Sequence, residues 1–302
     1  MPPVEPDHST TVLPPIPELL SVEPIGTERF RGVSPFHWPG GRVFGGLVAG
    51  QALRAAGSTV GADSLPHSLH AYFLRLGRPD LPLDHVVTRV RDGRSFSTRL
   101  VEVAQAGEVI FTLTASFHRT ESGEEYQVQR AADAPVPTDD GASPGEVLPH
   151  LTALTDLEVR DLGPTVPEPD GTFRSTRRMW LRVRGPQADG RLPDDPLLHA
   201  SVLTFLSDMG VVSAVRPPST PVEWDTVMGA SLDHSLWFHR PARVDGWLFY
   251  DLHSLSVSGS RGVVRGVMHE ASGRLCASMT QEALVRHTEG VAPRVWGVRP
   301  EV

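Results

Sequence analysis

The stretch His67-Ser-Leu-His-Ala-Tyr-Phe-Leu-Arg75 recurs in the second half of the chain as His234-Ser-Leu-Trp-Phe-His-Arg240. A helical pattern precedes each copy, and a β-rich stretch follows each copy. In both halves a glycine turn, at Gly107 and at Gly273, leads into a final strand. This internal repeat predicts two similar modules, each made of a helix followed by antiparallel strands.

The repeat also predicts how the chain is divided. One helix on one curled sheet buries a single face, whereas two such modules side by side can join their sheets over a shared core. We therefore expect an α+β fold with modules at 25–120 and 173–288. The segment 121–172, rich in Pro, Gly and acidic residues, is predicted to be a linker. Residues 1–24 are expected to form a flexible arm, and 289–302 a tail.

Composition excludes several classes of protein. All 28 basic residues are Arg, so chemistry that needs a lysine amine is absent. The net charge of −8 and the lack of a basic stripe argue against a nucleic-acid partner. No apolar run is long enough for a membrane span, and the first residues do not resemble a signal peptide. The single cysteine, Cys276, rules out an internal disulfide and fits a cytoplasmic protein.

Two helices can be placed from their patterns. The first should run from the glycine-rich segment around Gly46 to about Val60, with Gly50 among small residues that allow close approach to another backbone. The second should start at Asp194-Asp195-Pro196, because acidic residues and proline suit a first helical turn. Its apolar pattern predicts that it continues to about Val215.

Three polar residues stand out as candidates for chemistry. Asp208 lies beside the apolar stripe of the second helix, where an unpartnered carboxylate costs several kcal/mol. Gln281 interrupts an alternating apolar row in the last strand, and a buried amide needs partners for both its oxygen and its nitrogen. Ser231 shortly precedes the repeated histidine. Each also has an ordinary structural explanation: an Arg-paired carboxylate, a backbone-satisfied amide, and a serine at a strand start.

Other catalytic patterns are missing. There is no Gly-x-Ser-x-Gly around a nucleophile and no His-Glu-x-x-His for a metal. His234 and His239 are separated by an odd number of positions, so a strand places them on opposite faces and they are poor joint metal ligands. Cys276 is expected to be a packed thiol. We therefore predict neither a metal site nor a covalent serine hydrolase.

Several motifs together resemble one family. Arg42-Val-Phe-Gly-Gly-Leu-Val-Ala-Gly-Gln-Ala-Leu53, the first repeat and Arg91-Asp-Gly-Arg-Ser-Phe-Ser-Thr-Arg99 resemble the N-terminal half of type II acyl-CoA thioesterases, the TesB family. Leu232-Asp-His-Ser-Leu-Trp-Phe-His-Arg-Pro241 and Ser260-Arg-Gly-Val-Val-Arg-Gly266 resemble its C-terminal half. The resemblance implies a double hotdog fold, in which each sheet wraps a long helix. It also implies homo-oligomers, since family members often form dimers or tetramers.

The same resemblance implies an activity and a site. The family hydrolyses acyl-CoA to a fatty acid and free CoA without a metal or cofactor. Its catalytic Asp, Thr or Ser, and Gln fall on Asp208, Ser231 and Gln281. This chain departs from the family in its longer Pro-rich linker and in the sequence Thr280-Gln-Glu-Ala.

The expected mechanism is water-mediated. Asp208 would act as general base on a water that Ser231 and Gln281 orient, while backbone N–H groups near a helix N-terminus meet the thioester oxygen. The acyl chain would lie between helix and sheet, and Arg side chains would hold the CoA phosphates. Two alternatives stay open: a hotdog hydratase or dehydratase recruiting His234 or His37, and a non-catalytic acyl-binding module.

Overall fold

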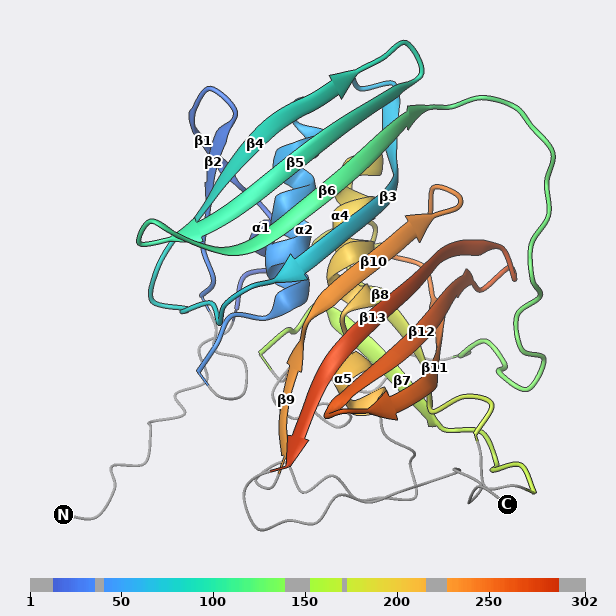
Figure 1. The fold of residues 1–302 in the computed structure, drawn as a ribbon. Helices are drawn as coiled ribbons and strands as arrows, with labels where there is room; N and C mark the ends of the chain where they lie inside the picture. The colour runs from blue at the N-terminus through green and yellow to red at the C-terminus, as the bar shows by residue number, and fades with distance from the viewer. Residues whose placement is uncertain (1–12, 36–40, 139–152, 170–172, 216–226, 288–302) are drawn as a thin grey trace.

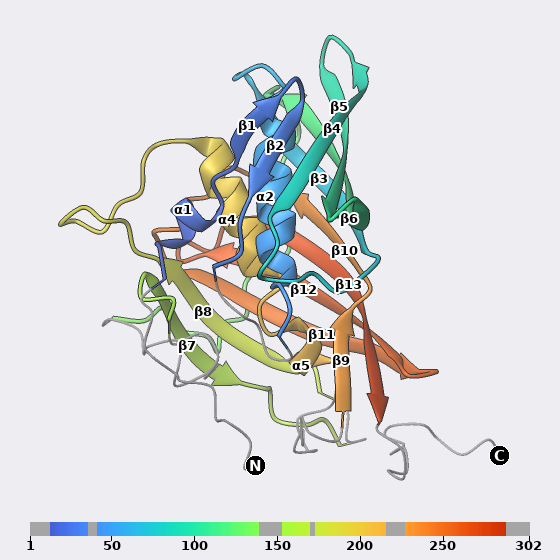
Figure 2. The same cartoon turned by 90° about the vertical axis from the view of Figure 1, so that its left-hand side faces the viewer.

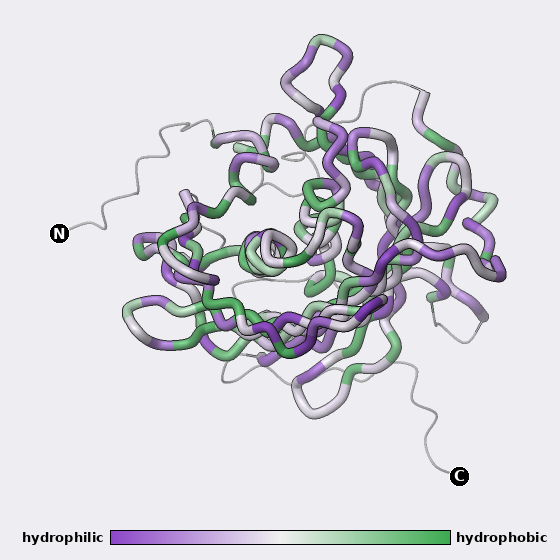
Figure 3. The backbone as a smooth tube through the Cα atoms, turned by 90° about the horizontal axis from the view of Figure 1, so that it is seen from above, coloured by the Kyte–Doolittle hydropathy of each residue, from purple (hydrophilic) through white to green (hydrophobic). Residues whose placement is uncertain are grey.

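The computed structural model describes residues 13–35, 41–138, 153–169, 173–215 and 227–287. A long, curved antiparallel sheet wraps two helices that lie side by side (Figure 1). A side view (Figure 2) and a view from above (Figure 3) show both helices inside the curve of the sheet. This architecture confirms the predicted α+β double hotdog.

The two units contain matching elements. The first consists of α2 (Gly45–Gly57), β3 (Ser64–Phe73), β4 (Leu83–Asp92), β5 (Phe96–Gln105) and β6 (Glu108–Arg119). The second consists of α4 (Pro196–Ser207), β10 (Asp233–Phe238), β11 (Leu248–Ser258), β12 (Arg261–Glu270) and β13 (Leu275–His287). Around them lie α1 (Ile16–Leu19), β1 (Glu23–Gly26), β2 (Arg29–Gly32), β7 (Leu157–Gly163), β8 (Arg177–Val183), α5 (Val211–Ala214) and β9 (Val227–Ser231).

The two copies of the repeat form the centre of the sheet. β3 pairs antiparallel with β10, and Leu69 lies directly opposite Leu236. From β3 the sheet continues through β6, β5 and β4, and from β10 it continues through β13, β12 and β11. The repeat therefore places two half-sheets of the same strand order about a common centre, with no open edge between them.

The helices α2 and α4 pack with their backbones in close contact, because α2 presents glycines to α4. A Cβ on Gly46 would lie 2.5 Å from the carbonyl oxygen of Phe205, and one on Gly50 would lie 3.0 Å from that of Ser201. Only a residue without a side chain leaves room for the neighbouring backbone at Gly46. The predicted role of the small residues in the first helix is confirmed.

The second helix begins as predicted but ends early. Asp195 caps α4, because its Oδ1 accepts hydrogen bonds from the N–H groups of Leu197 (2.9 Å) and Leu198 (3.1 Å). The expectation that this helix runs to Val215 is wrong. Gly210 adopts a left-handed conformation (φ 72°), which ends the helical path before the short α5. Asp208 consequently lies at the C-terminal end of α4.

The N-terminal segment is packed rather than loose from residue 13 onward. Leu13, Ile16, Leu19 and Leu20 are buried in the main core. The carboxylate of Asp156 accepts a hydrogen bond from the backbone N–H of Ile16 at 2.7 Å. The expectation of a flexible arm through residue 24 is therefore wrong for 13–24, and residues 1–12 lie outside the described residues.

The segment expected to be a linker contributes structure to the second unit. It contains β7, which pairs with β8 at the edge of the sheet. Residues 124–138, which we call the strap, run beside the second unit after β6 (Figure 1). A second apolar cluster forms there, in which Ala134 of the strap joins Trp180, Trp247 and Phe249. The predicted tail at 289–302 lies outside the described residues.

In the described part of the chain, no helix has the length and apolar character needed to cross a bilayer.

Replacing Gly46 by Ala should lower the free energy of unfolding by about 1–3 kcal/mol. The new methyl group would meet the Phe205 carbonyl at 2.5 Å, which outweighs the better helix propensity of Ala. Urea unfolding measures the change. Gly123→Ala is the matched control, because no atom lies within 4 Å of its added Cβ. Equal stability of the two variants would contradict the close packing of α2 on α4.

Asp156→Asn should stabilise the protein more at pH 8 than at pH 4. Burial raises the pKa of Asp156 from 3.8 to about 6, so ionisation is costlier in the folded than in the unfolded chain. Stability of the native protein therefore falls as the pH rises from 3.8 to 6, by up to about 3 kcal/mol. Urea unfolding at several pH values tests this, with exposed Glu168→Gln as control. A pH-independent effect of Asp156→Asn would refute it.

Candidate active site

The structure brings Asp208, Ser231 and Gln281 together from three elements. Asp208 follows α4, Ser231 ends β9, and Gln281 lies within β13, the strand with which β9 pairs. The Nε2 group of Gln281 donates to Ser231 Oγ at 2.8 Å, and the Ser231 hydroxyl donates to Asp208 Oδ1 at 3.4 Å. The three side chains thus form one continuous chain of hydrogen bonds.

The carboxylate at the end of this chain is buried. Asp208 is 7% exposed and Gln281 is fully buried. Burial raises the pKa of Asp208 above its ordinary value. Nearby His234, in its protonated form, and hydrogen bonds from Gln281, the Gly46 N–H and Ser231 act in the opposite direction and lower this pKa. The outcome is a raised pKa, which makes Asp208 a stronger base than an exposed aspartate.

The first unit contributes to this site through the start of α2. The N-cap residue Phe44 makes no side-chain cap hydrogen bond, so α2 supplies no cap of its own. Asp208 acts as the cap instead, because its carboxylate accepts a hydrogen bond from the Gly46 N–H. A Cβ on Gly45 would lie 2.7 Å from Asp208 Oδ2. The consecutive glycines therefore let a carboxylate of the second unit reach the helix of the first.

A fourth side chain, His234, touches the predicted set and was missed as a site residue. Its Nδ1 lies 2.5 Å from Gln281 Oε1, and its Nε2 lies 2.8 Å from Ser207 Oγ. The signal was present in the sequence, because His234 shares its strand face with buried Leu236. As predicted, His239 points elsewhere: it bonds Ser278 Oγ, whereas His234 is buried toward the helices.

The first unit has no equivalent set of residues. Ala115 of β6 pairs with Leu69 as Met279 of β13 pairs with Leu236, so Phe117 occupies the position that corresponds to Gln281. The register of β3 shifts between Pro66 and Ser68. His67 consequently packs against Phe96 on the outer face and bonds Ser116 Oγ, unlike its repeat partner His234.

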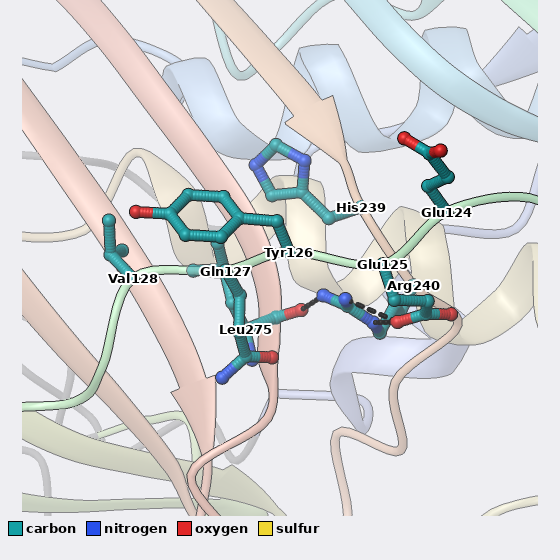
Figure 4. A pocket seen from close by; sticks show the side chains of 8 residues that line it. All are labelled: Glu124, Glu125, Tyr126, Gln127, Val128, His239, Arg240 and Leu275. Atoms are coloured by element: carbon teal, nitrogen blue, oxygen red, sulfur yellow. Dashed lines mark hydrogen bonds and ion pairs between the residues drawn. The ribbon is translucent and has the colours of Figure 1, made fainter.

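A pocket elsewhere on the surface holds none of the predicted residues. It is lined by strap residues 124–128 together with His239, Arg240 and Leu275 (Figure 4). Arg240 donates to Glu125 Oε2 at 2.6 Å and to the Leu275 carbonyl oxygen at 3.1 Å, which fastens the strap. This pocket is therefore part of the contact between the strap and the sheet.

Two further expectations from the sequence concern the single cysteine and the possible metal ligands. Cys276 is buried, its thiol contacts the Met268 carbonyl oxygen, and burial raises the pKa of the thiol to about 12. It is the packed thiol that the sequence predicts. Among the described residues, no group of three or more His, Cys, Asp or Glu side chains is arranged to hold a metal ion.

The fold and the polar set at the junction of its units define a double hotdog protein with a buried carboxylate where the two units meet. Residues 34–118 match the acyl-CoA thioesterase N-terminal domain, and residues 128–285 match the acyl-CoA thioesterase C-terminal domain. The chain belongs to the acyl-CoA thioesterase family, of the TesB-like type II. The resemblance noted in the sequence is thereby confirmed, and the family is one of thioester hydrolases.

Individual relatives agree along nearly the whole chain. Human acyl-coenzyme A thioesterase 8 is 33% identical, with 89% of this chain and 88% of that protein covered. Acyl-CoA thioesterase 2 of Haemophilus influenzae is 30% identical, with coverage of 90% and 96%. The crystal structure of the acyl-CoA thioesterase II TesB2 from Mycobacterium marinum superposes with a TM-score of 0.77 at 36% identity, covering 92% and 99%.

Proposed function

We propose that this protein hydrolyses acyl-CoA to a free carboxylic acid and CoA, using a water molecule held by Asp208, Ser231 and Gln281. The observation that carries the proposal is the chain of hydrogen bonds from Gln281 through Ser231 to the buried Asp208 carboxylate. Family membership supports the choice of substrate class. Neither the reaction nor the geometry calls for a cofactor.

The chemistry follows from the properties of these groups. Asp208 takes a proton from the water as the water oxygen attacks the thioester carbonyl carbon. Negative charge then develops on the carbonyl oxygen, and the start of α2, where Phe44 makes no side-chain cap hydrogen bond, is a source of backbone N–H groups for it. When the C–S bond breaks, the protonated Asp208 returns its proton to the CoA thiolate. Ser231 and Gln281 fix the water, which removes the cost of orienting it.

A hotdog hydratase is less well supported. Such an enzyme needs a histidine nitrogen that exchanges a proton with the substrate, yet both ring nitrogens of His234 are engaged by Ser207 and Gln281. His37 lies outside the described residues. A non-catalytic acyl-binding module gives no reason for the buried carboxylate to be held by three donors. Release of free thiol from acyl-CoA separates these functions from hydrolysis.

The setting of the reaction is also part of the proposal. A cytoplasmic location rests on the single buried Cys276. Self-association rests on the large apolar side chains that the outer face of the central strands exposes, Tyr72 (61% exposed) and Trp237 (37% exposed).

Asp208→Asn should lower kcat by about 10²–10⁴-fold, because a positioned general base supplies a factor of that size. The amide oxygen can still accept a hydrogen bond, so the fold should be retained. Thiol release from a panel of acyl-CoA chain lengths measures the loss. Asp251→Asn is the control, since Asp251 is also buried but lies in a strand away from the site. An unchanged kcat in Asp208→Asn would reject the proposed role.

The pH profile of kcat/KM should show an acid limb above the range of an exposed aspartate, whose pKa is about 4. Asp208 acts as a base only when ionised, and burial raises its pKa. Activity should therefore rise with pH through the raised pKa and then level off. Initial rates of thiol release in a buffer series measure the profile. Full activity persisting down to about pH 4 would contradict it.

A further inference from the structure

We propose that His234 is a positioning residue, which fixes the orientation of the Gln281 amide and thereby turns the Ser231 hydroxyl toward Asp208. This inference deepens the proposed function and rests on it. It adds a residue that neither touches the water nor exchanges a proton with substrate. It also assigns His234 a single tautomer, with the proton on Nδ1.

The position of His234 suits this role. It lies on β10 with its side chain toward the helices, and it is only 1% exposed. Gln281 Oε1 and Ser207 Oγ contact its two ring nitrogens, at 2.5 Å and 2.8 Å. The ring therefore links the end of α4 to β13, the two elements that carry Asp208 and Gln281.

The direction of each hydrogen bond in this network follows from its final acceptor, the Asp208 carboxylate. An ionised carboxylate only accepts, so the single proton of Ser231 points to Asp208. Ser231 Oγ then accepts from Gln281 Nε2, which leaves Gln281 Oε1 facing His234. A carbonyl oxygen only accepts, so His234 Nδ1 must carry a proton.

The other ring nitrogen completes the assignment. Burial lowers the pKa of His234, so the imidazole is neutral and carries one proton. With that proton on Nδ1, Nε2 accepts from the Ser207 hydroxyl. The Ser207 hydroxyl can also donate to the Thr204 carbonyl oxygen at 2.8 Å, so the tautomer with its proton on Nδ1 requires that this single hydroxyl proton goes to Nε2 instead. The carbonyl of Ser207 is held separately by the Tyr250 hydroxyl at 2.5 Å.

Loss of the Nδ1 donor would disturb the site without changing its shape. The oxygen and nitrogen of an amide have nearly the same size, so only hydrogen bonds decide which one faces Ser231. With the amide reversed, Oε1 would accept the Ser231 proton, and Asp208 would lose that donor. The water would then lose its orientation, while residues that bind CoA would be unaffected.

The tautomer is tested first, because it does not depend on activity. Two-dimensional ¹H–¹⁵N NMR of the ¹⁵N-histidine-labelled full chain distinguishes a proton on Nδ1 from one on Nε2. The signals of His234 are assigned by their absence in His234→Asn. We expect a neutral ring protonated on Nδ1. A ring protonated on Nε2 would overturn the assigned polarity of the network.

The kinetic test uses two amides that each replace one ring nitrogen. Asn places its NH₂ near the position of Nδ1, whereas Gln reaches the position of Nε2. His234→Gln should lower kcat about 10²-fold with KM little changed, as expected for a misplaced reacting group. In His234→Asn, kcat should stay much closer to the native value, because the Asn NH₂ replaces the Nδ1 donor. His239→Gln is the matched control, since that side chain bonds Ser278 outside the site.

The outcomes separate this inference from the proposed function. Equal kcat in His234→Gln and His234→Asn, with both variants as stable as the native chain in urea, would overturn the positioning role. If Asp208→Asn still loses activity in that case, the proposed function stands and only the role of His234 falls. If Asp208→Asn also keeps full activity, the proposed catalytic set itself fails. Should His234→Gln not fold, the tautomer measurement alone decides the inference.

Discussion

The close approach of α2 to α4 is the contact on which the site depends. Gly46 brings the start of α2 against the Phe205 carbonyl, and Asp208 lies three residues further along the chain. Because the two helices are this close, the Asp208 carboxylate accepts a hydrogen bond from the backbone N–H of Gly46 in the first unit. Burial and this N–H act on its pKa in opposite directions, so the helix contact limits how far burial raises it. A bulkier residue at the start of α2 would disturb both packing and electrostatics.

Much of the fold could be predicted, because some sequence patterns are compatible with a single structure. The internal repeat predicts the two units, and the spacing of glycines in the first helix predicts its close packing against another backbone. Asp208 and Gln281 were found because a polar residue in an apolar row requires a partner. The approach of Ser231 to Gln281 depends on the pairing of β9 with β13, a contact between strands distant in sequence.

Other features were missed for identifiable physical reasons. The apolar pattern of α4 continues into α5, so only the left-handed conformation of Gly210 marks the end of the helix. The N-terminal segment was read from its prolines, although its few leucines and Ile16 are what the core buries. His67 and His234 are identical in the repeat, yet the register shift in β3 turns one outward. Single-residue shifts of this kind leave no trace in hydrophobic pattern.

The strap gives the long, Pro-rich connection a structural purpose. Arg130 lies with its guanidinium carbon 5.2 Å from the centre of the Trp180 ring, and Arg178 donates to Asp133 at 2.8 Å. These contacts cover the apolar cluster on the outer face of the second unit.

The shared site also bears on how a duplicated chain evolves. One copy supplies a helix start, the other supplies the carboxylate that caps it, and Phe117 occupies the position in the first unit that is equivalent to Gln281. Under the proposed mechanism, selection on a single reaction therefore acts on both halves at once. They are free to diverge in sequence, but natural recombination that separated them would leave each descendant with half an enzyme.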